Sequence, residues 1–297
     1  MAWTLEEGLL SDSMRGVTWP DPGLFDDAKR FEWVAKSIAK RLSWGRHQSK
    51  WLASGIEFDQ YRHYVPGDDL RLLDWKKYAR TGRYYMRQSE QEKAHSLSIH
   101  LDDSPSMAYA EAQISKLDYA KLLAAVLTYI TASQSDHFGW YGANDTGCQG
   151  RSLGSWHASI RVLQVHQTYS ISKKATPKMI GSMSGACIWM TDLYMDIPDM
   201  EKYLSHLRGS YREVLVIHFM GRNEESLDFA DSLRFRDLET GEVVVAQSSV
   251  IAESYRRALG SHLLSVQELC RRYSTEVHRV YLDDNPVDFL RRILTRR

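Results

Sequence analysis

A short strand that ends in a polar loop and leads into a long helix most limits what this chain can fold into. Polar and apolar side chains alternate from Ser96 to Leu101, a period of two that predicts a strand. The polar residues Asp102–Met107 follow, and a helix is predicted from about Ser115. A strand, a loop and a helix in this order open an α/β sheet, and such sheets bind ligands at the carboxyl ends of their strands. The loop is therefore a candidate site.

Strands and helices are predicted to alternate along the rest of the chain. The uninterrupted apolar runs at 186–190 and 214–219 are typical of buried parallel strands. Apolar residues recur at helical spacing over 116–133, and a long helix is predicted over 250–272. The sequence therefore predicts a doubly wound, mostly parallel α/β sheet. Further strands are expected at 137–141, 232–238, 243–246 and 276–282, and further helices at 25–42, 70–78, 156–169, 200–207 and 287–294.

The length of 297 residues allows more than one structural unit. We assign residues 1–93 to an N-terminal extension and residues 94–297 to the α/β domain. The extension is expected to be helical or irregular, to carry a charged segment and to pack on the sheet domain.

Charge and cysteine content limit the classes of function. Lys and Arg number 38 and Asp and Glu also number 38, so the formal net charge is zero, whereas proteins that coat nucleic acid are strongly basic. The three cysteines lie far apart without metal-binding spacing, which indicates reduced thiols in a cytoplasmic protein. The most apolar stretch, residues 122–130, is too short to cross a bilayer, so no membrane span is predicted.

Acidic, basic and aromatic residues are closely mixed in residues 55–93. Because the opposite charges nearly cancel, we interpret this segment as a clasp of ion pairs, either a structural contact or a partner-binding surface. The residues assigned to the clasp are Arg62, Asp68, Asp69, Arg71, Asp74, Trp75 and Arg80. Alternatively, the basic and aromatic run at 75–87 binds single-stranded nucleic acid. The zero net charge favours the clasp.

A second aspartate, Asp192, directly follows another buried strand. If the two strands are neighbours in the sheet, Asp102, Ser104, Ser106 and Asp192 are expected to meet in one crevice. Their oxygens suit a hard divalent cation, Mg²⁺ or Mn²⁺. The alternative is purely structural, with Asp102 and Ser104 bonding to backbone N–H groups at a helix entrance.

Several motifs together resemble one known family. In the first half of the chain they are Gly55-x-Glu57-Phe58, Arg62-x-Tyr64, Pro66-Gly67-Asp68-Asp69-x-Arg71, Asp74-Trp75 and Ala79-Arg80. Further along the chain they are Leu101-Asp102-x-Ser104-x-Ser106-Met107, Thr191-Asp192-Leu193 and Arg236-Asp237-x-Glu239-Thr240-Gly241. The chain is identified by them, over roughly residues 25–297, as a member of the domain of unknown function 58 family.

That resemblance implies a von Willebrand factor A-like domain with a metal-ion-dependent adhesion site. It also implies partnership with a MoxR-type AAA+ ATPase and a chaperone-like role in the maturation or remodelling of an unknown client protein. A complete adhesion site adds a threonine from the loop after the sheet hairpin. This sequence instead has Ser152 and Ser155 near the expected place, and Thr146 in the hairpin turn itself.

The sequence favours a non-enzymatic adaptor, with no catalytic residues assigned. A P-loop, a G-x-S-x-G nucleophile motif and zinc signatures are all missing from it. His100 and His218 fall at strand ends and are expected to be core or rim residues. The alternative function is a metal-dependent phosphoester hydrolase that uses the same Asp and Ser cluster.

Overall fold

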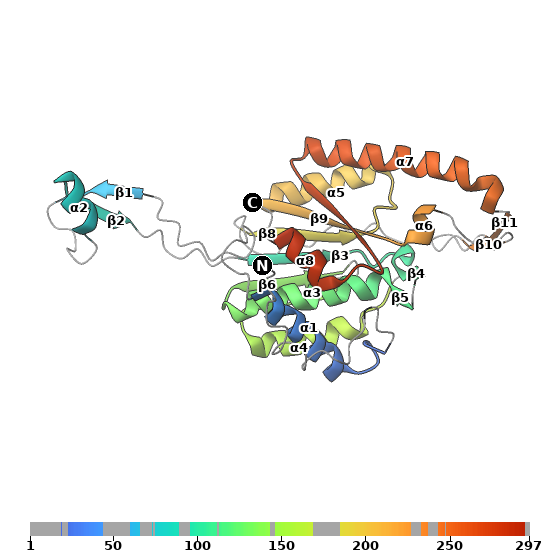
Figure 1. Ribbon diagram of the computed structural model, residues 1–297, viewed down its shortest axis with the longest axis horizontal. Coiled ribbons are helices and arrows are strands. Elements are labelled where there is room, and N and C mark those ends of the chain that lie inside the picture. Colours follow the sequence, from blue (N-terminus) through green and yellow to red (C-terminus); the bar gives the residue numbers. More distant parts are fainter. Residues whose placement is uncertain are drawn as a thin grey trace, which may run out of the picture.

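The computed structural model describes residues 19, 23–43, 60–65, 73, 75–88, 96–111, 113–142, 146–168, 185–226, 233–236, 243–246 and 248–294. At its centre lies a six-stranded sheet with the order β12-β9-β8-β3-β6-β7 (Figure 1). Its strands are β3 (Ser96–Leu101), β6 (His137–Tyr141), β7 (Gly147–Gly150), β8 (Ala186–Thr191), β9 (Glu213–Met220) and β12 (Glu276–Tyr281). β7 is antiparallel to β6, and the other neighbouring strands are parallel. The predicted fold class, a doubly wound and mostly parallel α/β sheet, is confirmed.

Helices cover both faces of this sheet (Figure 1). The principal helices are α1 (Ala28–Ser43), α3 (Lys116–Ser133), α4 (Leu153–Val165), α5 (Ile197–Ser210), α7 (Ser248–Arg272) and α8 (Pro286–Leu294). Apolar side chains of α1, α3, α4 and α8 form one core with the sheet, and those of α5 and α7 form a second core on the opposite face. The site described below lies between these two layers, at the edge of the sheet.

The alternation in β3 separates the two cores. Leu97, Ile99 and Leu101 join the core under α1 and α3. His100 faces the other layer, where its two ring nitrogens lie 3.2 Å and 3.1 Å from the hydroxyls of Tyr203 and Tyr211. A polar residue is tolerated inside the domain because both of its ring nitrogens have hydrogen-bond partners.

α3 is buried on nearly all sides because α1 and α4 pack on the face that it turns away from the sheet. Its first turn is capped by Ser115, whose hydroxyl accepts the backbone N–H of Asp118 at 3.0 Å. This burial brings Lys116 and Lys121 inside the protein, where each contacts carboxylates or carbonyl groups.

Some boundaries and short elements differ from the sequence prediction. The helix predicted over 156–169 begins at Leu153, because Ser152 and Ser155 form a reciprocal capping box at its start. The helix predicted over 70–78 is α2 (Trp75–Thr81). The short elements that the prediction missed are β1 (Gln60–His63), β2 (Tyr85–Gln88), the 3-10 helix at Pro105–Ala108, β4 (Ala110–Glu111), β5 (Ile114–Ser115) and α6 (Arg222–Ser226). They are too short for hydrophobic periodicity to reveal.

Two parts of the N-terminal extension are described. α1 packs on α3, α4 and α8, and the division of the chain at residue 93 stays a prediction. The second part is a small unit of β1 (Gln60–His63) and β2 (Tyr85–Gln88), which pair antiparallel, with α2 between them in sequence. A separate hairpin later in the chain pairs β10 (Leu233–Arg236) with β11 (Val243–Ala246).

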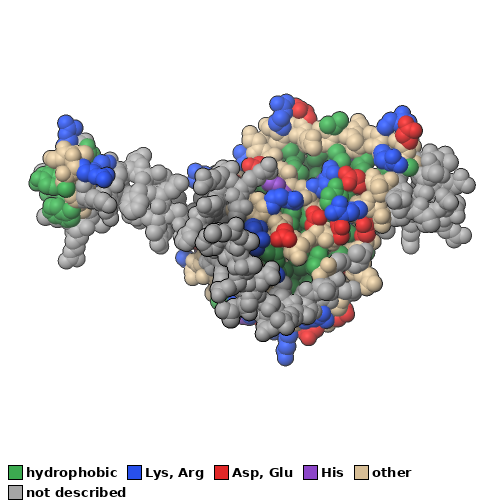
Figure 2. Space-filling view, in the orientation of Figure 1, with side chains coloured by type: hydrophobic (Ala, Val, Ile, Leu, Met, Phe, Trp, Pro, Cys, Tyr) green, Lys and Arg blue, Asp and Glu red, His purple; other side chains and the backbone are tan. Residues whose placement is uncertain are grey.

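Charged side chains do not separate by sign on the face shown in Figure 2, in keeping with the zero net charge of the chain. Among the described ion pairs, Arg222 bonds to both Asp283 and Asp284. In the described part of the chain, no helix has the length and apolar character needed to cross a membrane.

Candidate functional site

Asp102 and Asp192 meet at the carboxyl edge of the sheet. Asp102 follows β3 and Asp192 follows β8, and these strands are parallel neighbours with Leu101 opposite Met190. The N–H of Asp102 donates to the carbonyl of Met190 at 2.8 Å, which extends the pairing to the aspartate itself. After β3 the chain crosses to β6 on one side, and it returns later to β8 on the other. Such a reversal of strand order is where open α/β sheets bind ligands.

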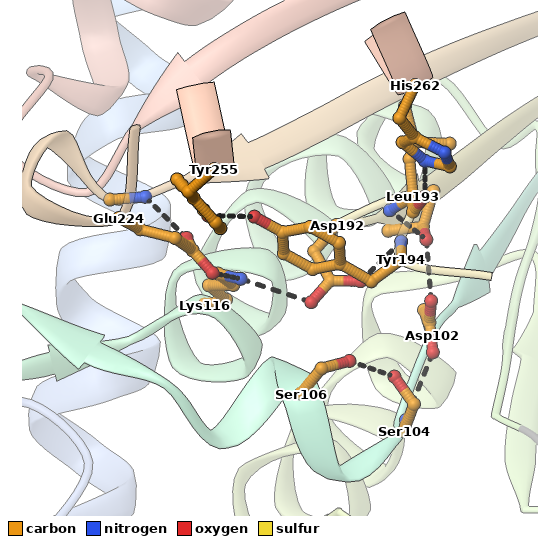
Figure 3. A network of polar contacts seen from close by, with 12 residues as sticks. Asp102, Ser104, Ser106, Lys116, Asp192, Leu193, Tyr194, Glu224, Tyr255 and His262 are labelled. Atoms are coloured by element: carbon orange, nitrogen blue, oxygen red, sulfur yellow. Dashed lines mark hydrogen bonds and ion pairs between the residues drawn. The ribbon is translucent and has the colours of Figure 1, made fainter. Parts of the chain in front are cut away.

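The serine loop brings two hydroxyl groups to the same edge. The hydroxyls of Ser104 and Ser106 lie 2.9 Å apart, and the N–H of Ser104 donates to Asp102 Oδ1 at 3.0 Å. Ser104 precedes the short 3-10 helix, but its side chain makes no capping bond. Figure 3 shows both hydroxyls and the carboxylates of Asp102 and Asp192 turned toward the same space. The purely structural alternative therefore explains the hydrogen bond from the Ser104 N–H to Asp102, but it does not explain the positions of the two serine hydroxyls.

Burial and a nearby like charge make ionisation of Asp102 costly. Its side chain is half-buried, and desolvation together with the charge of Asp192 raises its pKa to about 6. The hydroxyl of Thr191 and the Ser104 N–H act in the opposite direction by hydrogen bonding to the carboxylate. A cation close to this carboxylate would stabilise its ionised form.

Asp192 already has a cation beside it. Lys116, at the start of α3, places its ammonium 3.1 Å from Asp192 Oδ2 and 2.6 Å from Glu224 Oε1. The Lys116 side chain is entirely buried, and the rings of Tyr109 and Tyr194 lie 5.2 Å and 4.8 Å from its ammonium. Burial raises the pKa of Glu224, which also accepts the N–H of Gly221 at 3.0 Å.

Lys116 and Glu224 were not predicted as site residues from the sequence. Lys116 did carry a signal, because helical spacing places it on the same face as the buried Leu123 and Leu127, where a lysine is unexpected. Glu224 carried none, since it lies in the five-residue helix α6 and is 108 positions from Lys116.

The hairpin and its following helix place the candidate threonine substitutes in different positions. Gly150 of β7 pairs with Phe138 near the start of β6, so Ser152 and Ser155 lie at the opposite, amino edge of the sheet. Their hydroxyls cap α4 there. The expectation that these two serines lie near the place of the missing threonine is therefore wrong, because β7 runs antiparallel to β6. Thr146 lies at the carboxyl edge, where its carbonyl accepts the N–H of Gly142 at 2.9 Å.

A second buried pair lies beside the aspartates. Asp103 Oδ2 is 3.0 Å from His166 Nε2, and both side chains are almost completely buried.

His100 and His218, the two histidines noted in the sequence, are core residues, as expected. Burial lowers the pKa of His100 to about 4 and that of His218 to about 3, so both are neutral at pH 7.

The clasp residues are described only in part. Trp75 and Arg80 lie on α2 with exposed side chains, and the rings of Tyr78 and Tyr84 stack beside them with centroids 4.4 Å apart. Arg62 lies in β1, but its side chain is outside the described part. The other clasp residues, Asp68, Asp69, Arg71 and Asp74, also lie outside the described residues. The clasp, and the nucleic-acid alternative for residues 75–87, therefore stay predictions.

The fold and the site define a class of protein. It is a doubly wound α/β domain with carboxylate and hydroxyl side chains at the point where the strand order reverses. The chain belongs to the family described as "Protein of unknown function DUF58", whose model matches residues 60–263. This confirms the family indicated by the sequence motifs.

Similar proteins are found by sequence and by fold. The chain is 29% identical over 124 residues to "Uncharacterized protein Mb1516" of Mycobacterium bovis and to "Uncharacterized protein Rv1480" of Mycobacterium tuberculosis. Each match covers 42% of this chain and 39% of the relative. Among solved structures, the hypothetical protein BatB from Bacteroides thetaiotaomicron is 16% identical with a TM-score of 0.39, covering 68% of this chain and 97% of that one. An aerotolerance-related membrane protein from Bacteroides fragilis is 17% identical with a TM-score of 0.36, covering 67% and 96%.

Proposed function

We propose that this protein is a non-enzymatic adaptor that captures a partner protein at the carboxyl edge of its sheet. A divalent cation, Mg²⁺ or Mn²⁺, held by Asp102, Ser104, Ser106 and Asp192 makes the contact. The observation that carries the proposal is the meeting of two carboxylates and two hydroxyls at the ends of two adjacent strands.

The donor chemistry fits such a cation. Carboxylate and hydroxyl oxygens are hard ligands, and Mg²⁺ keeps several waters when protein ligands are few. Among the described residues no three His, Cys, Asp or Glu side chains form a metal-binding group, so the serine hydroxyls and waters would complete the coordination.

The charges of the site also fit a divalent ion. Asp102, Asp192 and Glu224 contribute three carboxylates, and Lys116 contributes one ammonium. When all are ionised, two negative charges are left in a buried place. Unpaired buried charges are costly, and a divalent cation would neutralise them.

An ion bound at this edge would keep a position open for an oxygen ligand from outside. A carboxylate of a partner protein is the natural ligand for that position. The resemblance to the domain of unknown function 58 family suggests a MoxR-type AAA+ ATPase as a partner, with chaperone-like action on a client protein. The adaptor would then supply recognition, and the ATPase would supply the energy of ATP hydrolysis.

Co-purification with the MoxR-type ATPase of the same genome tests this function. We expect capture by the wild-type protein in Mg²⁺, and loss of capture in chelator or in the Asp102→Ala and Asp192→Ala variants. Ser152→Ala is the matched control, because Ser152 lies at the other edge of the sheet and its replacement should leave capture unchanged. Equal capture in all variants and in chelator would refute the proposal. Phosphoester hydrolysis that depends on Mg²⁺ and on Asp102 would instead favour the hydrolase.

A further inference from the structure

Lys116 stands out as a buried cation that touches the proposed ion site. Its ammonium lies between Asp192 and Glu224, at 3.1 Å and 2.6 Å, and its side chain is fully buried. The rings of Tyr109 and Tyr194 flank it, so both charged and aromatic groups hold the ammonium in place. Figure 3 shows Lys116 between the two carboxylates, with Asp192 facing the serine loop on its other side.

Both carboxylate oxygens of Asp192 already have hydrogen-bond partners. Its Oδ2 bonds to Lys116, and its Oδ1 accepts the N–H of Tyr194 at 3.2 Å. A divalent ion at the serine loop therefore binds a carboxylate whose charge is already balanced in part. Repulsion between the ion and the buried ammonium weakens the binding further.

We propose that Lys116 is a resident cation that sets the affinity of the site for divalent ions. It holds Asp192 when no metal is bound and competes with the metal for that carboxylate. Glu224 opposes this competition by drawing the ammonium toward α6. This inference rests on the proposed function, since it concerns the same ion site, and it makes Lys116 an affinity-determining residue for that ion.

The decisive variant is Lys116→Met combined with Glu224→Gln. The pair removes one positive and one negative charge, so the net charge of the site stays the same while Asp192 is released from its ion pair. We expect Mn²⁺ to bind at least about tenfold more tightly than in the wild type, a change of the size that groups surrounding metal ligands produce. Glu224→Gln alone leaves Lys116 with Asp192 as its remaining partner of this carboxylate pair, so this variant should bind Mn²⁺ more weakly.

Lys121→Met is the matched control. Lys121 is also a buried lysine of α3, but its ammonium bonds to Asp118 at 2.8 Å and to the carbonyls of Gln164 and His166, both at 3.0 Å. Its loss removes the same charge from the same helix without freeing Asp192. We expect it to leave Mn²⁺ affinity within about twofold of the wild type, the range of independent sites.

Mn²⁺ titration followed by the electron paramagnetic resonance signal of the free ion measures these affinities. Circular dichroism confirms folding of each variant, and the charge-balanced double variant guards against misfolding of Lys116→Met alone. Equal affinity in the wild type and the double variant would overturn the inference while leaving the proposed function intact. An equal gain in Mn²⁺ affinity in Lys121→Met would also overturn the inference, because it would indicate a general effect of charge. Absence of Mn²⁺ binding from every variant would overturn the inference and the proposed ion together, whereas binding by the double variant alone would support the inference.

Discussion

His100 shows how burial decides the chemistry of a single side chain. It lies in β3 between the hydroxyls of Tyr203 and Tyr211, and burial lowers its pKa to about 4 from an ordinary value of 6.5. The folded protein therefore binds fewer protons at this ring than the unfolded chain does between these two pH values. By linkage, His100 lowers stability as the pH falls below 6.5, and the loss is complete once the pH is below about 4.

Replacement of His100 by Gln tests this dependence. We expect the wild type to lose on the order of 3 kcal/mol of unfolding free energy through this residue across that pH range. The variant should lack this part of the acid sensitivity, although it is less stable at pH 8 through lost packing. Denaturant unfolding at several pH values between 4 and 8 measures the difference, and parallel pH profiles for the two proteins would refute the assignment.

Residues of the site were predictable to different degrees. Asp102 and Asp192 each follow a buried strand, so the sequence placed both at the carboxyl ends of strands. That these two strands are neighbours comes from the fold. Lys116 and Glu224 meet only through the tertiary fold, because they belong to elements far apart in the chain. Ser152 and Ser155 were misplaced because the direction of β7 decides which edge of the sheet they reach.

At the level of elements, α4 gives a local test of this correction. Ser152 caps the helix by accepting the N–H of Ser155 at 3.2 Å, and Ser155 accepts the N–H of Ser152 at 3.0 Å. Ser152→Ala should therefore cost about 1 kcal/mol of stability, the usual loss for an N-cap. Thermal unfolding measures the loss. Mn²⁺ affinity should not change, and a clear fall in that affinity would return Ser152 to the site.

Long periodic elements were the easiest to predict. The predicted bounds of the 18-residue helix α3 agree with the structure, because apolar residues recur at helical spacing along its length. The two-residue strands β4 and β5 and the helix α6 have no such pattern. These short pieces contribute to the candidate site, since α6 carries Glu224 and Tyr109 directly precedes β4.

The whole molecule combines a predictable sheet with a less predictable extension. The mostly parallel sheet follows from the alternation of strands and helices, whereas the order of its strands comes only from the structure. The two cores follow from the apolar faces of the helices. No comparable rule predicts the ion pairs of residues 55–93, because ion pairs depend on side-chain geometry that spacing in the sequence does not determine.

We propose that the ends of β3 and β8 act as one centre for a divalent ion. A double-mutant cycle of Asp102→Asn and Asp192→Asn, read by Mn²⁺ titration and by capture of the ATPase, tests it most directly. If one ion is shared, either single substitution should lower Mn²⁺ affinity at least about tenfold and abolish capture, and the double variant should be little worse than the singles. Unchanged affinity and capture in either single variant would contradict the claim.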